Sequence, residues 1–211
     1  MKISKMRIVD IHTHNVNAEN ALISVAPDML PLHSTNCYSV GLHPWDTVSV
    51  ADSDLETLKT AAIQNNVYAI GECGIDKLRG ASIEIQKKIF EYHIQLSEDL
   101  CKPLIIHQVK SLDEIFFYRK KYSPSQRWLI HGFRGNLLTA KQLLKAEIEF
   151  SLGSKFVSEI LQIMPMKSLF LESDDSLCFS ALLCKVAHLL SWSEQDLEQQ
   201  LVENNHSFLN V

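Results

Sequence analysis

The chain has 211 residues, of which 46% are hydrophobic and 21% charged, and this length and composition suit one globular domain over residues 1–211. The net charge of -5 excludes a global basic field, so nucleic-acid binding would need a local basic patch. Five cysteines without Cys-x-x-Cys spacing, no signal-peptide pattern and no apolar stretch of about 18 residues predict a cytoplasmic protein with no membrane partner.

Short apolar runs alternate with segments of helical periodicity along most of the chain. Strands are expected at 6–14, 21–26, 37–43, 67–73, 103–107, 127–131, 148–152 and 168–172. Helices are expected at about 53–65, 82–101, 111–122, 137–146, 159–163, 176–190 and 193–203. Ser53, Ser111 and Ser193 stand where helix N-caps are expected. The link between the first two strands is too short for a helix, so the early β/α units are abbreviated.

Eight short strands, most of them followed by a helix, predict an α/β fold of the (β/α)8 TIM-barrel type. An open doubly wound sheet is the alternative, but the chain has no Gly-x-Gly-x-x-Gly or other Gly-rich phosphate loop to support it. In a barrel, the carboxyl ends of all strands meet on one face. Polar residues at the ends of the apolar runs are therefore expected to lie together.

The first run ends in an Asp-x-His-x-His motif, and residues two apart project to the same face of a strand. His12 and His14 can therefore reach one small volume, with Asp10 below them on the same side. Neutral imidazole is a preferred ligand for borderline divalent metals. Later strand ends add polar residues of the kinds that bind metals: His43, Glu72, His107, His131 and Asp174.

Six of these side chains exceed what one tetrahedral ion needs and suit a two-metal site about 3.5–4 Å across. The predicted ligands are His12, His14, Glu72, His107, His131 and Asp174. Glu72 is the natural bridge, because one carboxylate can give an oxygen to each ion. Four histidines with two carboxylates suit zinc, manganese or iron better than magnesium.

Three further residues are open to two interpretations each. Lys77 and Arg79 follow the strand that carries Glu72, and they fit either an anion contact or solvated loop charges. Trp45 fits either stacking on a base or ring, or capping of the barrel rim. Cys73, beside Glu72, is interpreted as a small packing residue.

The motifs that carry these residues resemble, in order, those of the TatD family of metal-dependent deoxyribonucleases, within the amidohydrolase-like superfamily. The resemblance runs from Asp10 to about Leu209. Its motifs are Asp-Ile-His-Thr-His, Gly-Leu-His-Pro-Trp, Ile-Gly-Glu-Cys-Gly-Ile-Asp, Leu-Ile-Ile-His, His-Gly-Phe-Arg-Gly, Leu-Glu-Ser-Asp and the closing Asn-His-Ser-Phe-Leu of residues 205–209.

The resemblance implies a TIM barrel of the metal-dependent hydrolase type and two divalent ions (zinc, magnesium or manganese). It places the first ion near His12, His14, Glu72 and Asp174, and the second near Glu72, His107 and His131. It also implies cleavage of phosphodiester bonds in DNA, often from the 3′ end, by a metal-activated water. The catalytic residues would then be Glu72, Asp174 and His43.

Substrate contacts follow in part from the same resemblance. Arg134 would clamp a phosphate bidentately, His43 would contact the scissile group, and Lys77 would bind an anion. Asp10, below the metals, is expected to orient a histidine.

The chain departs from the family where substrate would bind. It is short after Asp174, and Gln108-Val109 replaces the usual Ser-Arg after the fifth-strand histidine. Two alternatives therefore stand beside a DNA substrate: hydrolysis of a small amide, lactone or phosphate ester, and a non-catalytic metal-binding subunit.

Overall fold

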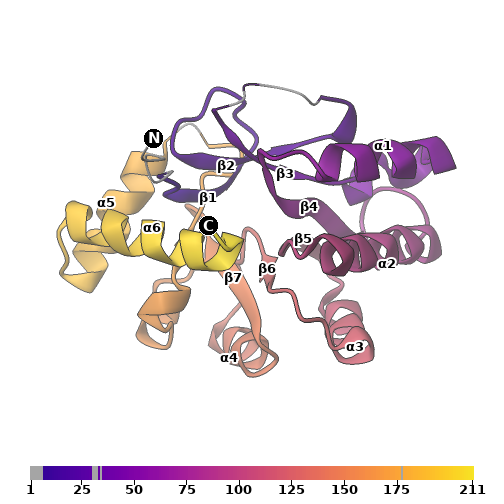
Figure 1. Ribbon diagram of the computed structural model, residues 1–211. Coiled ribbons are helices and arrows are strands. Elements are labelled where there is room, and N and C mark those ends of the chain that lie inside the picture. The colour runs from indigo at the N-terminus through magenta and orange to yellow at the C-terminus, as the bar shows by residue number, and fades with distance from the viewer. Residues whose placement is uncertain (1–6, 30–32, 34, 177) are drawn as a thin grey trace.

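The computed structural model describes residues 7–29, 33, 35–176 and 178–211. Eight parallel strands pair in the order in which they occur along the chain (Figure 1). They are β1 Asp10–Thr13, β2 Ala21–Val25, β3 Cys37–Val40, β4 Val67–Asp76, β5 Leu104–Val109, β6 Trp128–Ile130, β7 Ile148–Leu152 and β8 Phe170–Leu171. A parallel bridge between Thr13 and Asp174 joins the two ends of the sheet. This nearly closed barrel confirms the predicted fold, and its strand order excludes the doubly wound alternative.

Helices follow most of the strands and lie around the outside of the barrel (Figure 1). The α-helices are α1 Asp52–Ala62, α2 Ile83–Leu100, α3 Leu112–Tyr122, α4 Leu137–Lys145, α5 Phe179–Leu190 and α6 Glu194–Leu209. Short 3-10 helices are η1 Pro27–Met29, η2 Pro44–Ser49, η3 Ser158–Gln162 and η4 Met166–Ser168. Among the described residues, η1 is the only helix between β1 and β3, so the expected abbreviation of the early units is confirmed.

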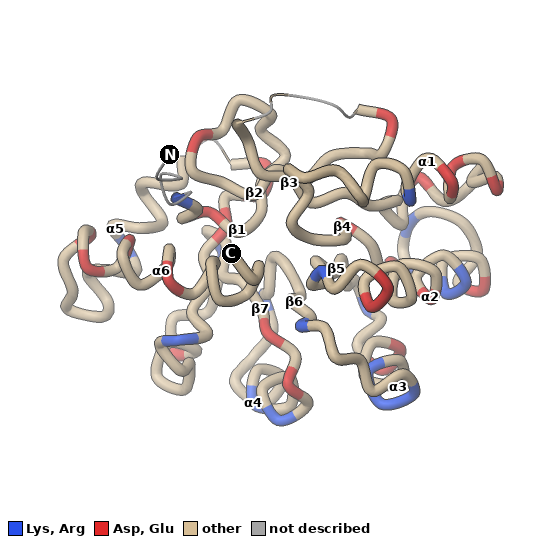
Figure 2. Tube along the Cα trace, in the orientation of Figure 1, with Lys and Arg blue, Asp and Glu red and all other residues tan. Residues whose placement is uncertain are grey.

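Figure 2 shows acidic and basic residues interspersed along the outer helices α2 and α3. This mixture of signs agrees with the modest net charge and gives these helices no single-sign field. Within the described part of the chain, no helix is both long enough and apolar enough to cross a bilayer.

The barrel interior is a separate apolar cluster that takes side chains from nearly every strand. Its buried members are Ile8, Ile11, Leu22, Cys37, Ala69, Ile105, Leu129, Phe170, Phe208 and Leu209. The last two come from the end of α6, and the rings of Phe170 and Phe208 meet edge to face at 5.5 Å. The end of α6 therefore fills the amino-terminal end of the barrel, opposite the end where β1, β4, β5 and β6 deliver their polar residues.

The last helix is longer than the sequence predicts, because α6 continues past residue 203 to Leu209. Residues 204 and 205 are polar, which breaks the apolar periodicity, yet both are buried. The Asn205 amide donates to the backbone carbonyls of Ile8 and Val9, and the Asn204 amide donates to carbonyls of η4 and the residue before β8. Each side-chain amide exchanges its hydrogen bonds to water for hydrogen bonds to backbone carbonyls, so burial of the two asparagines costs little.

The three predicted N-caps have different outcomes. Ser193 is confirmed, since its hydroxyl accepts the backbone amide of Asp196 at 3.0 Å. The prediction of Ser53 as an N-cap is wrong, because α1 already begins at Asp52. The carboxylate of Asp54 accepts the backbone amide of Ala51, the residue that precedes the helix. Ser111 does precede α3, but its hydroxyl donates to a carbonyl of β4.

Candidate metal centre

Two glycines bring β4 close to β5. Gly74 has a φ of 139°, and a Cβ at this position would lie 2.2 Å from the carbonyl oxygen of His107. Gly71 has a φ of 130°, and its Cβ would lie 2.3 Å from the carbonyl oxygen of Ile105. Only glycine adopts these backbone angles freely and leaves room for the neighbouring strand. Glu72, between them, is therefore held beside the end of β5.

The segment after β8 is held against the end of β1 by backbone hydrogen bonds. Asp174 donates its amide to the carbonyl of His12 at 3.0 Å and accepts the amide of His14 at 3.2 Å. The hydroxyl of Thr13 donates to the same carbonyl of Asp174 at 3.1 Å. This closure of the barrel places the carboxylate of Asp174 beside the two histidines of the Asp-x-His-x-His motif.

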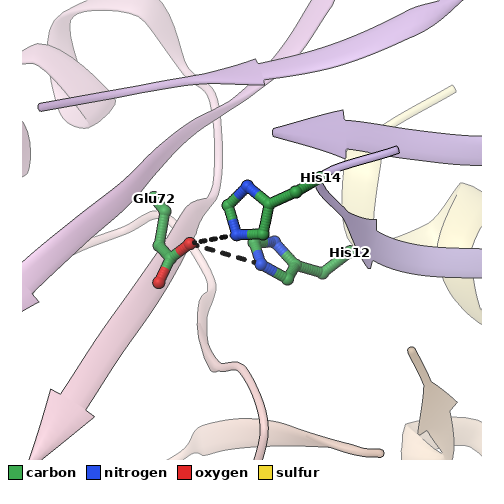
Figure 3. Close-up of side chains that lie close together, drawn as sticks. All are labelled: His12, His14 and Glu72. Carbon is green, nitrogen blue, oxygen red and sulfur yellow. Dashed lines mark ion pairs between the residues drawn. The ribbon is translucent and has the colours of Figure 1, made fainter. Parts of the chain in front are cut away.

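One oxygen of Glu72 faces these two histidines. Its Oε2 lies 3.3 Å from Nε2 of His12 and 3.1 Å from Nε2 of His14 (Figure 3). The Oδ1 atom of Asp174 lies 3.9 Å and 3.7 Å from the same two nitrogens. Two imidazole nitrogens and two carboxylate oxygens thus converge on one small volume, as a four-coordinate cation requires.

The other oxygen of Glu72 faces the ends of β5 and β6. Its Oε1 lies 2.6 Å from Nδ1 of His107 and 2.7 Å from Nε2 of His131. The carboxylate therefore presents one oxygen to each of two pairs of histidines. The structure brings all six predicted ligands together around it.

The donors of this cluster fit divalent cations on chemical grounds. Nε2 of His12 and Oε2 of Glu72 are buried and 3.3 Å apart, yet neither forms a hydrogen bond within the described residues. Such buried polar atoms are normally satisfied, and a cation is a partner that both a neutral imidazole nitrogen and a carboxylate oxygen accept. Nitrogen and carboxylate ligands in this ratio fit zinc or manganese.

The charge at the centre of the cluster is negative. Burial works to raise the pKa of Glu72, but the charge of His131 and the hydrogen bond with His107 hold it well below its ordinary value. Burial likewise works to lower the pKa of His131, and the carboxylates of Glu72 and Glu172 hold it well above its ordinary value. At neutral pH, Glu72 is therefore an anion that two cations can share.

Two carboxylates behind the cluster were missed by the sequence reasoning. Oε1 of Glu172 lies 3.5 Å from Nδ1 of His131, and Oδ2 of Asp76 lies 3.5 Å from Nε2 of His107. Each faces the ring nitrogen that does not point at Glu72, as in carboxylate–histidine–metal arrangements that orient the ligand. A signal for Asp76 was available in the sequence. Residues four apart on a strand lie on the same face, and Asp76 lies four residues after Glu72.

Asp10, expected to orient a histidine, contacts His12 through the backbone. Its Oδ1 accepts the backbone amides of His12 at 3.2 Å and Ser173 at 3.1 Å. Burial raises the pKa of Asp10 to about 7, against hydrogen bonds from Ser173 that lower it. Asp10 thus joins β1 to the segment after β8, and it supports the centre through the position of both chains.

His43 is distinct from the six candidate ligands because of its tautomer. Its Nδ1 accepts the backbone amide of Trp45 at 3.1 Å, so the proton of the neutral ring sits on Nε2. That Nε2 lies 3.0 Å from Oε1 of Glu72. In this tautomer Nε2 donates to Glu72, and His43 also lies with Glu72 and His107 in one of the groups close enough to hold a metal ion.

Arg79 and Trp45 lie together beside the cluster, and Lys77 does not join them. The indole of Trp45 donates to Asp76 at 2.6 Å, and the guanidinium of Arg79 lies 4.4 Å from its ring centroid. Trp45 is 44% exposed at the rim, so one face remains available. Lys77 instead pairs with Glu114 on α3 at 2.7 Å and does not line the pocket at the cluster. The predicted anion contact of Lys77 therefore has no support in the structure.

A pocket of about 430 Å³ opens at the cluster, within the range of small-molecule sites. Its floor includes His14, Glu72, His107, His131 and Asp174, and His43 lines its side. Its remaining wall is largely apolar. Five of the six candidate ligands thus line this pocket, and the sixth, His12, is fully buried.

An eight-stranded parallel barrel with histidines and carboxylates at the strand carboxyl ends defines a TIM barrel with the ligand set of a metal centre. A model of the family described as TatD related DNase matches residues 31–210. The chain belongs to this family.

Individual relatives show how far the likeness extends. The uncharacterized metal-dependent hydrolase YabD of Bacillus subtilis is 25% identical over 168 residues, which cover 75% of this chain and 66% of YabD. The 3'-5' ssDNA/RNA exonuclease TatD of Klebsiella pneumoniae is 24% identical, over 82% of this chain and 70% of that protein. The chain thus spans about two thirds of the length of such relatives.

A solved structure has the same fold. The crystal structure of the TatD homologue YJJV from Escherichia coli matches with a TM-score of 0.81 at 18% identity, over 98% of this chain and 99% of that one. The likeness supports the barrel architecture over nearly the whole chain.

Proposed function

We propose that the chain is a divalent-metal-dependent hydrolase that cleaves phosphodiester bonds, with the ends of DNA strands as substrate. One observation carries the proposal: the two oxygens of Glu72 face separate pairs of histidines, with the carboxylate of Asp174 beside the first pair. Family membership supports it, and so does the exonuclease name of the Klebsiella relative.

The metal ligands follow from this geometry. His12, His14, Asp174 and Oε2 of Glu72 would hold one divalent ion, and His107, His131 and Oε1 of Glu72 would hold a second. When bound, such a pair lowers the pKa of water and neutralises charge on a phosphoryl group. Glu172 and Asp76 would keep the rings of His131 and His107 in the orientation that binding needs.

The remaining residues position the substrate and move protons. Asp174 has a partly exposed carboxylate that lines the pocket, so it would accept the proton of the attacking water. His43 would donate its Nε2 proton to a phosphoryl oxygen as negative charge develops there. Trp45 would give a flat apolar face to a base.

A second candidate, a hydrolase of small uncharged esters, amides or lactones, is favoured by the lining of the pocket. No lysine or arginine is among the described residues that line it, while Asp46 and Asp175 join the cluster carboxylates. A polyanion gains nothing from such a wall. The same barrel and metal centre serve either substrate.

The protein is first dialysed against a buffer that contains zinc or manganese. Its turnover is then measured on single-stranded oligonucleotide, bis(4-nitrophenyl) phosphate, a simple carboxyl ester and a lactone. We expect metal-dependent cleavage of both phosphodiesters, loss in Asp174→Asn, and retention in the matched control Asp113→Asn, which changes an exposed aspartate of α3. Cleavage of the ester or lactone alone would favour the second candidate. A protein that binds metal but cleaves none of the four would be a metal-binding subunit.

A further inference from the structure

The pocket at the metal centre has an apolar end that the cluster does not explain. Its lining outside the cluster includes the apolar side chains Val16, Val25, Ala26, Met29, Leu42 and Trp45, with Ser24 and Asp46 among them. Apolar and aromatic walls of this kind bind flat or apolar groups through burial and stacking. This end of the pocket suits a sugar and a base better than a phosphate.

A second hollow of about 300 Å³ lies on the other side of Asp174. It is formed by the segments that follow β6, β7 and β8, and it holds the side chains of Arg134 and Lys155. Asp174 and Asp175 line both hollows and so form the boundary between them. The metal centre therefore has an apolar hollow on one side and a hollow with two cations on the other.

The cations of the second hollow are available to a ligand. Arg134 and Lys155 are exposed, and neither forms an ion pair with another described residue. Of the carboxylates around them, Glu172 is held by the Ser151 hydroxyl and faces His131, and Asp174 belongs to the centre. The lining thus holds two cations and three carboxylates, of which only Asp175 is exposed, so Arg134 and Lys155 are the groups in this hollow that can pair with an anion.

We propose that the hollow of Arg134 and Lys155 binds the second phosphate of a single-stranded oligonucleotide while the apolar hollow holds the terminal nucleoside. This inference rests on the proposed function. A phosphodiester bound at the centre has two ester substituents, which leave it in different directions. One substituent is the terminal nucleoside, which suits the apolar hollow. The other continues to the next phosphate, which suits the hollow with the two cations. The arrangement makes the enzyme selective for substrates with at least two phosphates.

The test compares kcat/KM on the thymidine dinucleotide TpT, which has one phosphate, with that on TpTpT, which has two. The wild type should prefer TpTpT by about tenfold, the size of one charge-assisted hydrogen bond. The double variant Arg134→Gln/Lys155→Gln should lose that preference and keep its activity on TpT. Lys167→Gln removes an exposed cation from η4, before β8 begins, and should behave as the wild type.

Salt dependence separates an anion contact from a structural effect. For the wild type, log kcat/KM against log salt should be steeper for TpTpT than for TpT by about 0.7, the value for one phosphate contact on a single strand. The double variant should show equal slopes. If the double variant lost kcat/KM equally on TpT and TpTpT, or kept the wild-type preference for TpTpT, the subsite would be overturned.

Binding distinguishes failure of the subsite from failure of the proposed function. Calorimetry of TpTpT and TpT is carried out on the same proteins without added metal. Tighter binding of TpTpT by the wild type, lost in the double variant, supports the subsite even when neither compound is cleaved. Equal binding of the two compounds by the wild type overturns it, whatever the turnover on bis(4-nitrophenyl) phosphate.

Discussion

A buried histidine outside the metal centre makes the stability of the protein depend on pH. His93 of α2 is fully buried, and its Nδ1 donates to the carbonyl of Ile89 at 2.7 Å. Its Nε2 accepts the backbone amide of Leu42 at 3.0 Å, directly before His43. Both nitrogens are satisfied only when the ring is neutral. Burial accordingly lowers the pKa of His93 to about 4.

The size of the effect follows from the two states of this ring. In the unfolded chain the imidazole takes up a proton near pH 6.5, while in the folded protein it stays neutral down to about pH 4. The stability it contributes is therefore complete above pH 6.5 and is lost as the pH falls towards 4. Between pH 7 and pH 5, this linkage removes about 2 kcal/mol from the free energy of unfolding.

Urea unfolding of the metal-free wild type and of His93→Gln at pH 7 and pH 5 measures this loss. Glutamine keeps a neutral donor and acceptor but does not titrate, so the variant should lose about 2 kcal/mol less than the wild type. Replacement of an exposed histidine, His188→Gln, should leave the wild-type loss unchanged. Equal losses in wild type and His93→Gln would refute the reasoning, because every other histidine is common to both proteins.

Two further predictions concern the interior and the ring behind the centre. Phe208→Ala opens a cavity in the barrel interior and should lower the free energy of unfolding by about 3–5 kcal/mol, measured by urea denaturation. An unchanged denaturation midpoint would show that α6 does not fill the barrel. Glu172→Gln removes the charge facing His131 and should weaken zinc binding by about 10–100-fold in calorimetric titration, with the fold intact by circular dichroism. Wild-type affinity would mean that Glu172 does not support this ligand.

The six candidate ligands were predictable because two simple rules agree at each of them. An apolar strand ends where each residue stands, and the carboxyl ends of parallel strands share one face. Glu72 shows the limit of these rules. Its central position depends on the approach of β4 to β5 at Gly71 and Gly74, which no periodicity encodes.

Other features could not be predicted because a polar residue has no fixed partner in sequence. Asn205 breaks the helical pattern, yet it is buried because carbonyls of the first strand segment accept its amide. Lys77 follows the Glu72 strand as an anion contact would, but Glu114 on α3 takes its charge. Glu172 stood in a recognised motif beside Asp174, and its role became visible only through its distance to His131.

The central claim is that Glu72 joins two metal sites, and counting bound metal tests it most directly. The wild type, Glu72→Ala and the exposed-site control Glu84→Ala are dialysed against zinc or manganese, and metal per chain is measured by mass spectrometry. We expect about two ions per chain for the wild type and the control, and less than one for Glu72→Ala. At most one ion in the wild type, or two ions retained by Glu72→Ala, would contradict it.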